Sequence, residues 1–196
     1  MFSDRSAIAY SADLVLTEMQ KAEAVAVIFY TGGGTMGDRI LGVGLEESEP
    51  LSWATGATGT STSFSTDLNN GSGNWDVITS ADTSAEATSS TSYPAFYYAN
   101  SYNAQGFTSD WYIPAKTELE ALRDKVASVN NSIAKIGTDE IATTSASTDS
   151  DTSDYWTSSQ FSEDDESAYH LKFASSTACA GASKGDTCHV RVIHEF

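Results

Sequence analysis

The order of its patterned segments is the feature that most constrains the fold of this chain. AVAVIFYT (24–31) predicts a buried strand, the glycines at 32–34 end it, and RILGVGLEE (39–47) predicts its hairpin partner. From YWTSSQF (155–161) onward the chain is again rich in strand patterns, and helical patterns lie between the two regions. A parallel sheet would need regular βαβ alternation, which is missing. The order therefore predicts an α+β fold.

The clearest helix is predicted within residues 110–137. Thr117 followed by Glu120 fits a capping box, and Gly137 is a plausible stop. The apolar stripe at helical spacing consists of Leu119, Leu122, Val126 and Val129.

Two shorter helical patterns accompany it. In ADLVLTEMQKAE (12–23), Thr17 and Gln20 resemble a capping box. YPAFYYANSYN (93–103) has a proline near its start, which suits a first helical turn. The face predicted for this second helix consists of Phe96, Ala99 and Asn100.

Long polar segments alternate with these elements. Residues 54–92 and 138–154 are dominated by Ser, Thr, Gly, Asn, Asp and Ala. Trp75, Val77 and Ile78 interrupt the first segment and are predicted to dock it to the core. With 40% hydrophobic and 11% aromatic residues in 196, one core carrying long surface loops is expected.

Charge excludes several partner classes. With 27 acidic and 10 basic residues, the net charge of −17 argues against nucleic acid, because phosphate binding needs a basic patch. It also argues against an anionic membrane surface. No apolar run is long enough to span a bilayer, so no direct membrane insertion is expected from this segment. The N-terminal residues do not resemble a secretory signal.

The cysteines, histidines and glycines do not have the spacing of standard metal or catalytic motifs. The pattern Cys-x8-Cys-His-x4-His matches no standard zinc spacing, and Cys188 and His189 would point to opposite faces of a strand. The spacing therefore predicts no metal site. A disulfide between Cys179 and Cys188 stays open, because geometry decides it. TGGGTMGD (31–38) favours a hairpin turn over a phosphate cradle, and the acidic run at 163–166 lacks EF-hand spacing.

Five segments in order resemble a known family. YPAFYYANSYN, DWYIPAKTELEAL, YWTSSQF, AYHLKF and the ending HVRVIHEF resemble bacterial variable proteins of diversity-generating retroelements, such as the Treponema variable protein, and their non-diversified relatives. The resemblance implies a C-type lectin-type domain over residues 24–196, preceded by a lead-in segment at 1–23. It further implies two helices, within 93–103 and 116–129, packed on a twisted, mostly antiparallel sheet that joins the N- and C-terminal strands.

The resemblance also implies a variable region at about residues 155–196. In variable members, adenine-directed mutagenesis of AAC or AAT codons rewrites this region, and such codons cannot yield Lys, Glu, Gln, Met or Trp. The stretch ASSTACAGASKGDTCH (174–189) meets that condition except at Lys184. An ordinary Ser/Thr-rich loop of a non-diversified relative remains the alternative.

Strand alternation gives this region two faces. Tyr169, Leu171 and Phe173 share one face, and His170 and Lys172 share the other. The ligand-binding residues predicted to be exposed are Phe161, Asp164, Asp165, Ser167, His170, Ser175, Thr177, Ala178, Cys179, Asp186, Thr187, Cys188 and His189.

The resemblance implies a binding function rather than an enzyme. The Glu-Pro-Asn and Trp-Asn-Asp motifs of calcium-dependent lectins are missing, which implies calcium-independent binding, and no cofactor is expected. The implied partner is a protein or other macromolecule met at the cell surface or outside the cell. Two alternatives stay open. One is a non-diversified surface or adhesin domain with a fixed partner, and the other is a metal-dependent enzyme using Cys179, Cys188 and the histidines.

Overall fold

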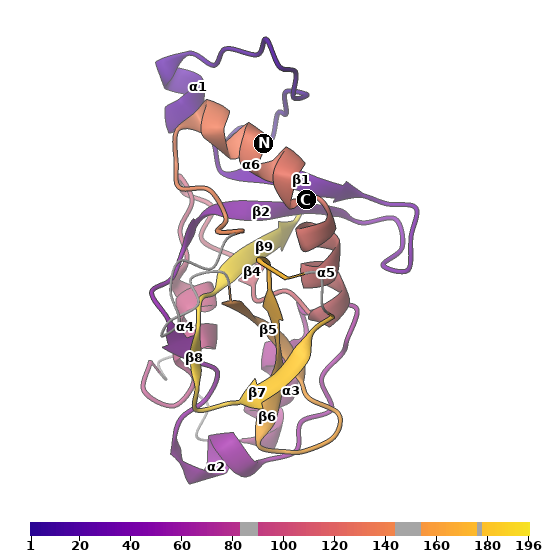
Figure 1. The fold of residues 1–196 in the computed structure, drawn as a ribbon. Helices are drawn as coiled ribbons and strands as arrows, with labels where there is room; N and C mark the ends of the chain where they lie inside the picture. Colours follow the sequence, from indigo (N-terminus) through magenta and orange to yellow (C-terminus); the bar gives the residue numbers. More distant parts are fainter. Residues whose placement is uncertain (83–89, 144–153, 176–177) are drawn as a thin grey trace.

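A central antiparallel sheet joins the two ends of the chain. The computed structural model describes residues 1–82, 90–143, 154–175 and 178–196. The sheet contains β1 (Ala26–Thr31), β2 (Ile40–Glu47), β9 (Arg191–Glu195) and β4 (Trp111–Tyr112), in the order β1-β2-β9-β4 (Figure 1). The predicted hairpin of β1 and β2 is confirmed, as is the meeting of N- and C-terminal strands.

A second sheet carries most of the C-terminal region. It contains β5 (Asp154–Gln160), β6 (Ser167–Lys172) and β7 (Ala180–Ser183), all antiparallel and in chain order. The short strands β3 (Leu51–Ser52) and β8 (Thr187–Cys188) form a separate pair. A parallel bridge between Tyr155 and His189 links the residue after β8 to β5.

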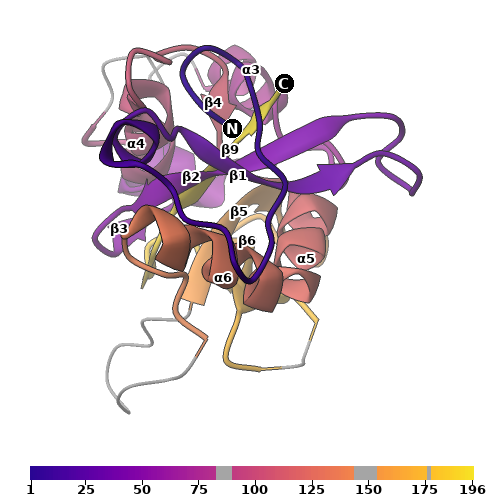
Figure 2. The same ribbon diagram turned by 90° about the horizontal axis from the view of Figure 1, so that it is seen from above.

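Helices lie on both sides of the central sheet. Figure 2 shows α3 and α4 on one side of β1, β2 and β9, with α5 and α6 on the other. Together with the sheets, they confirm the predicted α+β class. The helices are α1 (Glu18–Ala22), α2 (Gly56–Ser61), α3 (Asn74–Ala81), α4 (Pro94–Ser101), α5 (Lys116–Asp124) and α6 (Val126–Ile136).

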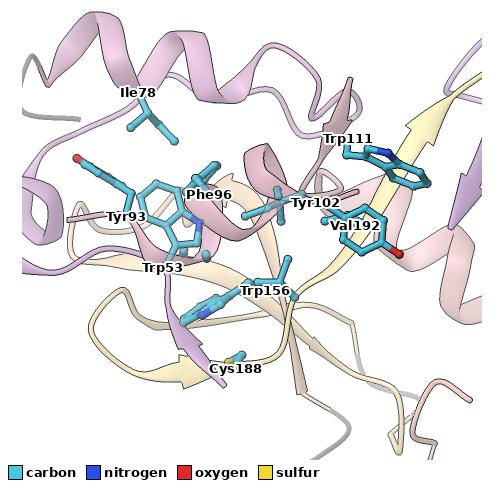
Figure 3. Close-up of a cluster of buried hydrophobic side chains, with 14 of the residues drawn as sticks. Trp53, Ile78, Tyr93, Phe96, Tyr102, Trp111, Trp156, Cys188 and Val192 are labelled. Atoms are coloured by element: carbon cyan, nitrogen blue, oxygen red, sulfur yellow. The ribbon is translucent and has the colours of Figure 1, made fainter. Parts of the chain in front are cut away.

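Alternation along the strands divides the buried side chains into two clusters. Val192 of β9 joins an aromatic cluster beneath α3 and α4, whereas Ile193 joins an aliphatic cluster beneath α5 and α6. Figure 3 shows the aromatic cluster, in which Trp53 packs edge-to-face on Phe96 with ring centroids 4.9 Å apart. The predicted helical stripe faces the aliphatic cluster, with Leu119, Leu122 and Val129 buried and Val126 partly buried.

The longest predicted helix is divided at Lys125. The backbone there leaves the helical region (φ −110°, ψ 3°), so Lys125 ends α5 and precedes α6. The predicted capping box is also displaced, because Glu118 accepts the Ala115 backbone N–H at 2.7 Å. Thr117 instead donates its hydroxyl to Asn69. Gly137 ends α6 with φ 91°, a left-handed conformation that glycine adopts without strain.

Two other predictions need correction, and one is confirmed. The predicted docking to the core is confirmed for Trp75 and Ile78, which both pack in the aromatic cluster, but the segment forms α3 rather than a loop. On α4, Asn100 is exposed and Ala95 takes the buried position beside Phe96 and Ala99. The capping box of Thr17 and Gln20 is present at the start of α1.

Candidate functional site

Two exposed segments of the second sheet form what we call the C-terminal surface. The first is the acidic turn 162–166 between β5 and β6, whose residues are all exposed. The second is 178–187, which contains β7 and the turn into β8 and is mostly exposed Ala, Gly, Ser, Asp and Thr. The two segments are adjacent because β6 pairs with β7, with Ser167 opposite Ser183. Small and acidic side chains therefore cover this end of the sheet.

Lys184 lies inside the second segment but is fully buried. Its ammonium donates to the backbone oxygens of Asp165 at 2.6 Å and Thr62 at 2.9 Å, and to Gln160 Oε1 at 3.1 Å. It also lies 4.7 Å from the ring centroid of Phe64, a distance at which the aromatic face attracts a cation. Lys184 thus fixes the acidic turn and the turn after β7 to the same point.

Burial changes the ionisation of Lys184. Loss of water around the ammonium lowers its pKa to about 8, and the neighbouring carboxylates of Asp165 and Asp164 partly oppose this shift. The ammonium is retained at neutral pH because carbonyl oxygens and aromatic rings surround it. Sequence reasoning missed Lys184 as a site residue. The sequence did contain a signal for it, because Lys184 is the one residue of 174–189 that the mutagenesis implied by the resemblance cannot produce.

Buried polar side chains of β5 support the C-terminal surface from below. Thr157, Ser158, Ser159 and Gln160 are all buried. Ser158 Oγ accepts from the Asn74 amide at 2.7 Å, and Gln160 Oε1 accepts the Phe64 backbone N–H at 2.8 Å. These bonds satisfy groups that would otherwise be buried without partners.

An aromatic pair, half-buried Phe161 and buried Tyr169, borders the surface at its α5 side. Phe161 packs edge-to-face on Tyr169 with centroids 4.9 Å apart, and the Lys116 ammonium lies 5.7 Å from the Tyr169 ring. A Cβ on Gly181 would come within 2.8 Å of the Phe161 ring, so the ring rests directly on the β7 backbone. Phe161 is therefore positioned as a rigid apolar neighbour of the small side chains.

The structure separates the predicted ligand-binding residues by exposure. Asp164, Asp165, Ala178, Asp186 and Thr187 are exposed on the C-terminal surface. The predicted exposure of Cys188 is wrong, because β8 turns its side chain into the aromatic cluster. Thr177 lies outside the described residues. The half-buried members are Phe161, Ser167, His170, Ser175, Cys179 and His189.

The two faces predicted for β6 are confirmed. Leu171 and Phe173 pack in the aliphatic cluster. His170 and Lys172 both approach the carboxylate of Asp154, His170 Nδ1 at 2.5 Å and Lys172 Nζ at 3.8 Å. His170 therefore packs against β5 rather than projecting into solvent.

The two cysteines occupy different environments and form no disulfide with each other. Cys179 borders the aliphatic cluster, where burial and the nearby Glu120 carboxylate raise its pKa to about 12. Cys188 lies near Asp154 and His170, and donor atoms of these three residues all fall within 4.8 Å of one another. Among the described residues, this group has the composition of a metal site.

The family follows from comparison with known proteins. A model described as the Lcl C-terminal domain matches residues 45–194. This chain belongs to the Lcl C-terminal domain family. The match covers every strand from β3 to β8 and most of β9, together with the whole C-terminal surface. It confirms the predicted resemblance to the variable-protein family.

A solved structure shares the fold. The chain is similar to a fimbrial protein from Bacteroides ovatus ATCC 8483, with a TM-score of 0.68 and 16% sequence identity. The alignment covers 100% of this chain and 48% of that protein, so the chain spans about half its length. None of the curated proteins compared matches the sequence. Within the described residues, no helix is both long and apolar enough to cross a bilayer.

Proposed function

We propose that this domain is a binding module whose C-terminal surface is diversified by a retroelement and recognises a protein or another macromolecule. The module belongs to a cell-surface or extracellular protein, a placement supported by the family and by the fimbrial neighbour. The proposal assigns the domain no catalytic role, and recognition of the partner itself requires no cofactor. Binding would use shape and hydrogen bonds on a rigid scaffold, as paratopes rich in small polar residues do.

One observation supports the proposal most. Within 174–189, Lys184 is the residue that adenine-directed mutagenesis cannot produce, and the same residue is fully buried. Its exposed neighbours Ala180, Ser183, Asp186 and Thr187 are all residues that such mutagenesis can produce. A diversified surface needs this separation, because contacts that maintain the fold must stay constant while exposed side chains change.

The same separation continues along β5. Trp156 and Gln160 cannot be produced by the mutagenesis, and both are buried. Glu163 and Glu166 of the acidic turn also cannot be produced, although they are exposed. In a diversified protein these two glutamates would be constant, whereas Asp164 and Asp165 between them could vary.

Sequencing the 3′ end of the gene and its neighbourhood tests the proposal. We expect a near-copy of the segment encoding residues 155–196, mismatched only at template adenines, beside a reverse transcriptase gene. Cells sampled from one population should differ at codons for exposed residues and agree at Trp156, Gln160 and Lys184. A gene with neither template nor reverse transcriptase would overturn diversification and favour a surface or adhesin domain with a fixed partner.

A further inference from the structure

Three metal-ligating side chains gather where β5, β6 and β8 meet. Asp154 begins β5, His170 lies within β6 and Cys188 ends β8. One donor atom from each, a carboxylate oxygen, an imidazole nitrogen and the thiol sulfur, lies within 4.8 Å of the other two. We call them the Asp–His–Cys trio.

Strand geometry explains why these distant residues meet. Asp154 pairs with Lys172 and Trp156 pairs with His170, so Asp154 and His170 are diagonal neighbours on one face. The segment after β8 is held along β5 by the His189 N–H, which donates to the Asp154 carbonyl at 2.9 Å. Figure 3 shows Cys188 close to Trp156 at the edge of the aromatic cluster.

Cys188 and His189 point to opposite sides, as the sequence predicted. The His189 ring nitrogen Nδ1 lies 2.7 Å from the Ser48 carbonyl oxygen, away from the trio. The histidine that accompanies Cys188 is therefore His170, which comes from another strand. A search of ligand spacing along the chain could not find this arrangement.

The imidazole of the trio is already oriented. Asp154 Oδ1 lies 2.5 Å from His170 Nδ1, and the His170 and Asp154 side chains are only 12% and 14% exposed. A carboxylate bound to one ring nitrogen fixes the ring and increases the basicity of the other nitrogen, which is the usual arrangement behind metal-bound histidines. Asp154 can thus act as a direct ligand or as the group that orients His170.

We propose that the Asp–His–Cys trio binds a single zinc ion. Sulfur, imidazole nitrogen and carboxylate oxygen are the donors that Zn²⁺ combines, whereas Mg²⁺ and Ca²⁺ require oxygen donors. Ligand atoms around a tetrahedral zinc are about 3.3–3.6 Å apart at ordinary bond lengths, so adjustments of about 1–1.5 Å bring the trio into range. Water would supply the remaining ligands.

A metal suits the trio better than nucleophilic catalysis by Cys188 does. Reactive cysteines are partly exposed, so that the thiolate can reach a substrate. Cys188 is only 4% exposed, which suits a bound metal ion better than attack on a substrate. The zinc site stands independently of the proposed macromolecular binding.

Metal titration of the untagged, metal-free chain tests the proposal. We expect one Zn²⁺ per chain by calorimetry, and Co²⁺ in its place should give a thiolate charge-transfer band and the strong visible absorption of tetrahedral cobalt. His170→Gln and Cys188→Ser should each weaken Zn²⁺ binding at least tenfold. Asp154→Asn should weaken it by about 10–100-fold, the range for ligands and their orienting groups.

Matched controls separate the trio from other thiol and histidine sites. Neither Cys179 nor His189 contributes a donor atom to the trio. Cys179→Ser and His189→Gln should therefore leave Zn²⁺ affinity within about twofold, because neither change removes a ligand or its orienting group. Cys188 is buried, so circular dichroism must first show that Cys188→Ser is folded. If it is not, the variants of the less buried His170 and Asp154 provide the test. The proposal is overturned if the chain binds no Zn²⁺, if the His170 and Asp154 variants bind as wild type does, or if Cys179→Ser abolishes the cobalt–thiolate band.

Discussion

The two larger sheets of this domain are held together in different ways. In the central sheet, Val43, Val192 and Ile193 are fully buried, and helices cover both faces with their apolar sides. In the second sheet, β5 buries Thr157, Ser158 and Gln160, which hydrogen-bond to Tyr169 of β6, to Asn74 of α3 and to the backbone of Phe64. Apolar packing therefore builds the scaffold, whereas hydrogen bonds position the C-terminal surface.

The C-terminal surface can vary independently of the residues that support it. Large side chains in a close-packed interior constrain one another, so changing one affects many. On β7 and the following turn, Ala180, Gly181 and Asp186 are exposed, and their backbone is placed by β6 pairing and by Lys184. Side chains here can change while the backbone contacts remain.

The largest expected effect is in the scaffold. Leu122→Ala on α5 removes a fully buried side chain from the aliphatic cluster. The free energy of unfolding should fall by about 2–5 kcal/mol, from lost transfer energy and the cavity that remains. Urea denaturation measures the change. Ala121→Gly, at a partly buried position of the same helix, should cost only about 1 kcal/mol, so equal losses would contradict the assigned core.

The next effect tests the support of the C-terminal surface. Lys184→Met keeps the length of the side chain but leaves the carbonyls of Thr62 and Asp165 without their donor. A loss of about 2–4 kcal/mol is expected, because an unsatisfied buried acceptor costs about 1–3 kcal/mol. Lys172→Met, at an exposed position of β6, should stay within about 0.5 kcal/mol. Similar values for the two lysines would show that Lys184 does not support this surface.

The scaffold could be predicted from the sequence because its elements carry their own patterns. AVAVIFYT, the Leu119 and Leu122 stripe and the glycine at 137 each specify a local structure through periodicity or capping. The support of the C-terminal surface could not be predicted in that way. The contacts of Lys184 join residues 62, 160 and 165, and the Asp–His–Cys trio joins three strands. Pairing between distant segments creates both, and no local pattern encodes it. The exposure predicted for Cys188 is wrong for the same reason, because the pairing of β8 with β3 is not visible in the local sequence.

The support of the C-terminal surface should also make stability depend on pH. The pKa of Lys184 is about 8 in the folded protein, below its value of 10.5 in the unfolded chain. Between these values the unfolded chain binds more protons, so the free energy of unfolding rises with pH, by at most about 1.4 kcal/mol per pH unit. Burial raises the pKa of Tyr112 and Tyr155, which acts in the opposite direction above about pH 10.

The measurement therefore compares wild type with Lys184→Met by urea denaturation from pH 7.5 to 9.5. The stability difference between them should grow with pH, because the variant lacks the titrating ammonium. A constant difference across this window would mean that the buried lysine keeps its ordinary pKa. The cation would then be better solvated than its hydrogen bonds indicate.

The smallest expected effect is on the surface itself. Asp186→Ala and Ala178→Ser change exposed side chains on either side of β7, while the Asp186 N–H still donates to the Ser183 carbonyl at 2.9 Å. Each should alter the free energy of unfolding by less than about 0.5 kcal/mol, the range for surface positions away from caps and buried groups. The two changes together should be additive, because the exposed side chains share no buried partner. A loss above 1 kcal/mol in either variant would mean that the C-terminal surface is coupled to its support, and a coupled surface could not be diversified freely. Suppose instead that these surface variants leave the free energy of unfolding unchanged while Lys184→Met lowers it strongly. The variable surface and its buried support would then be separated by only a few residues of one turn.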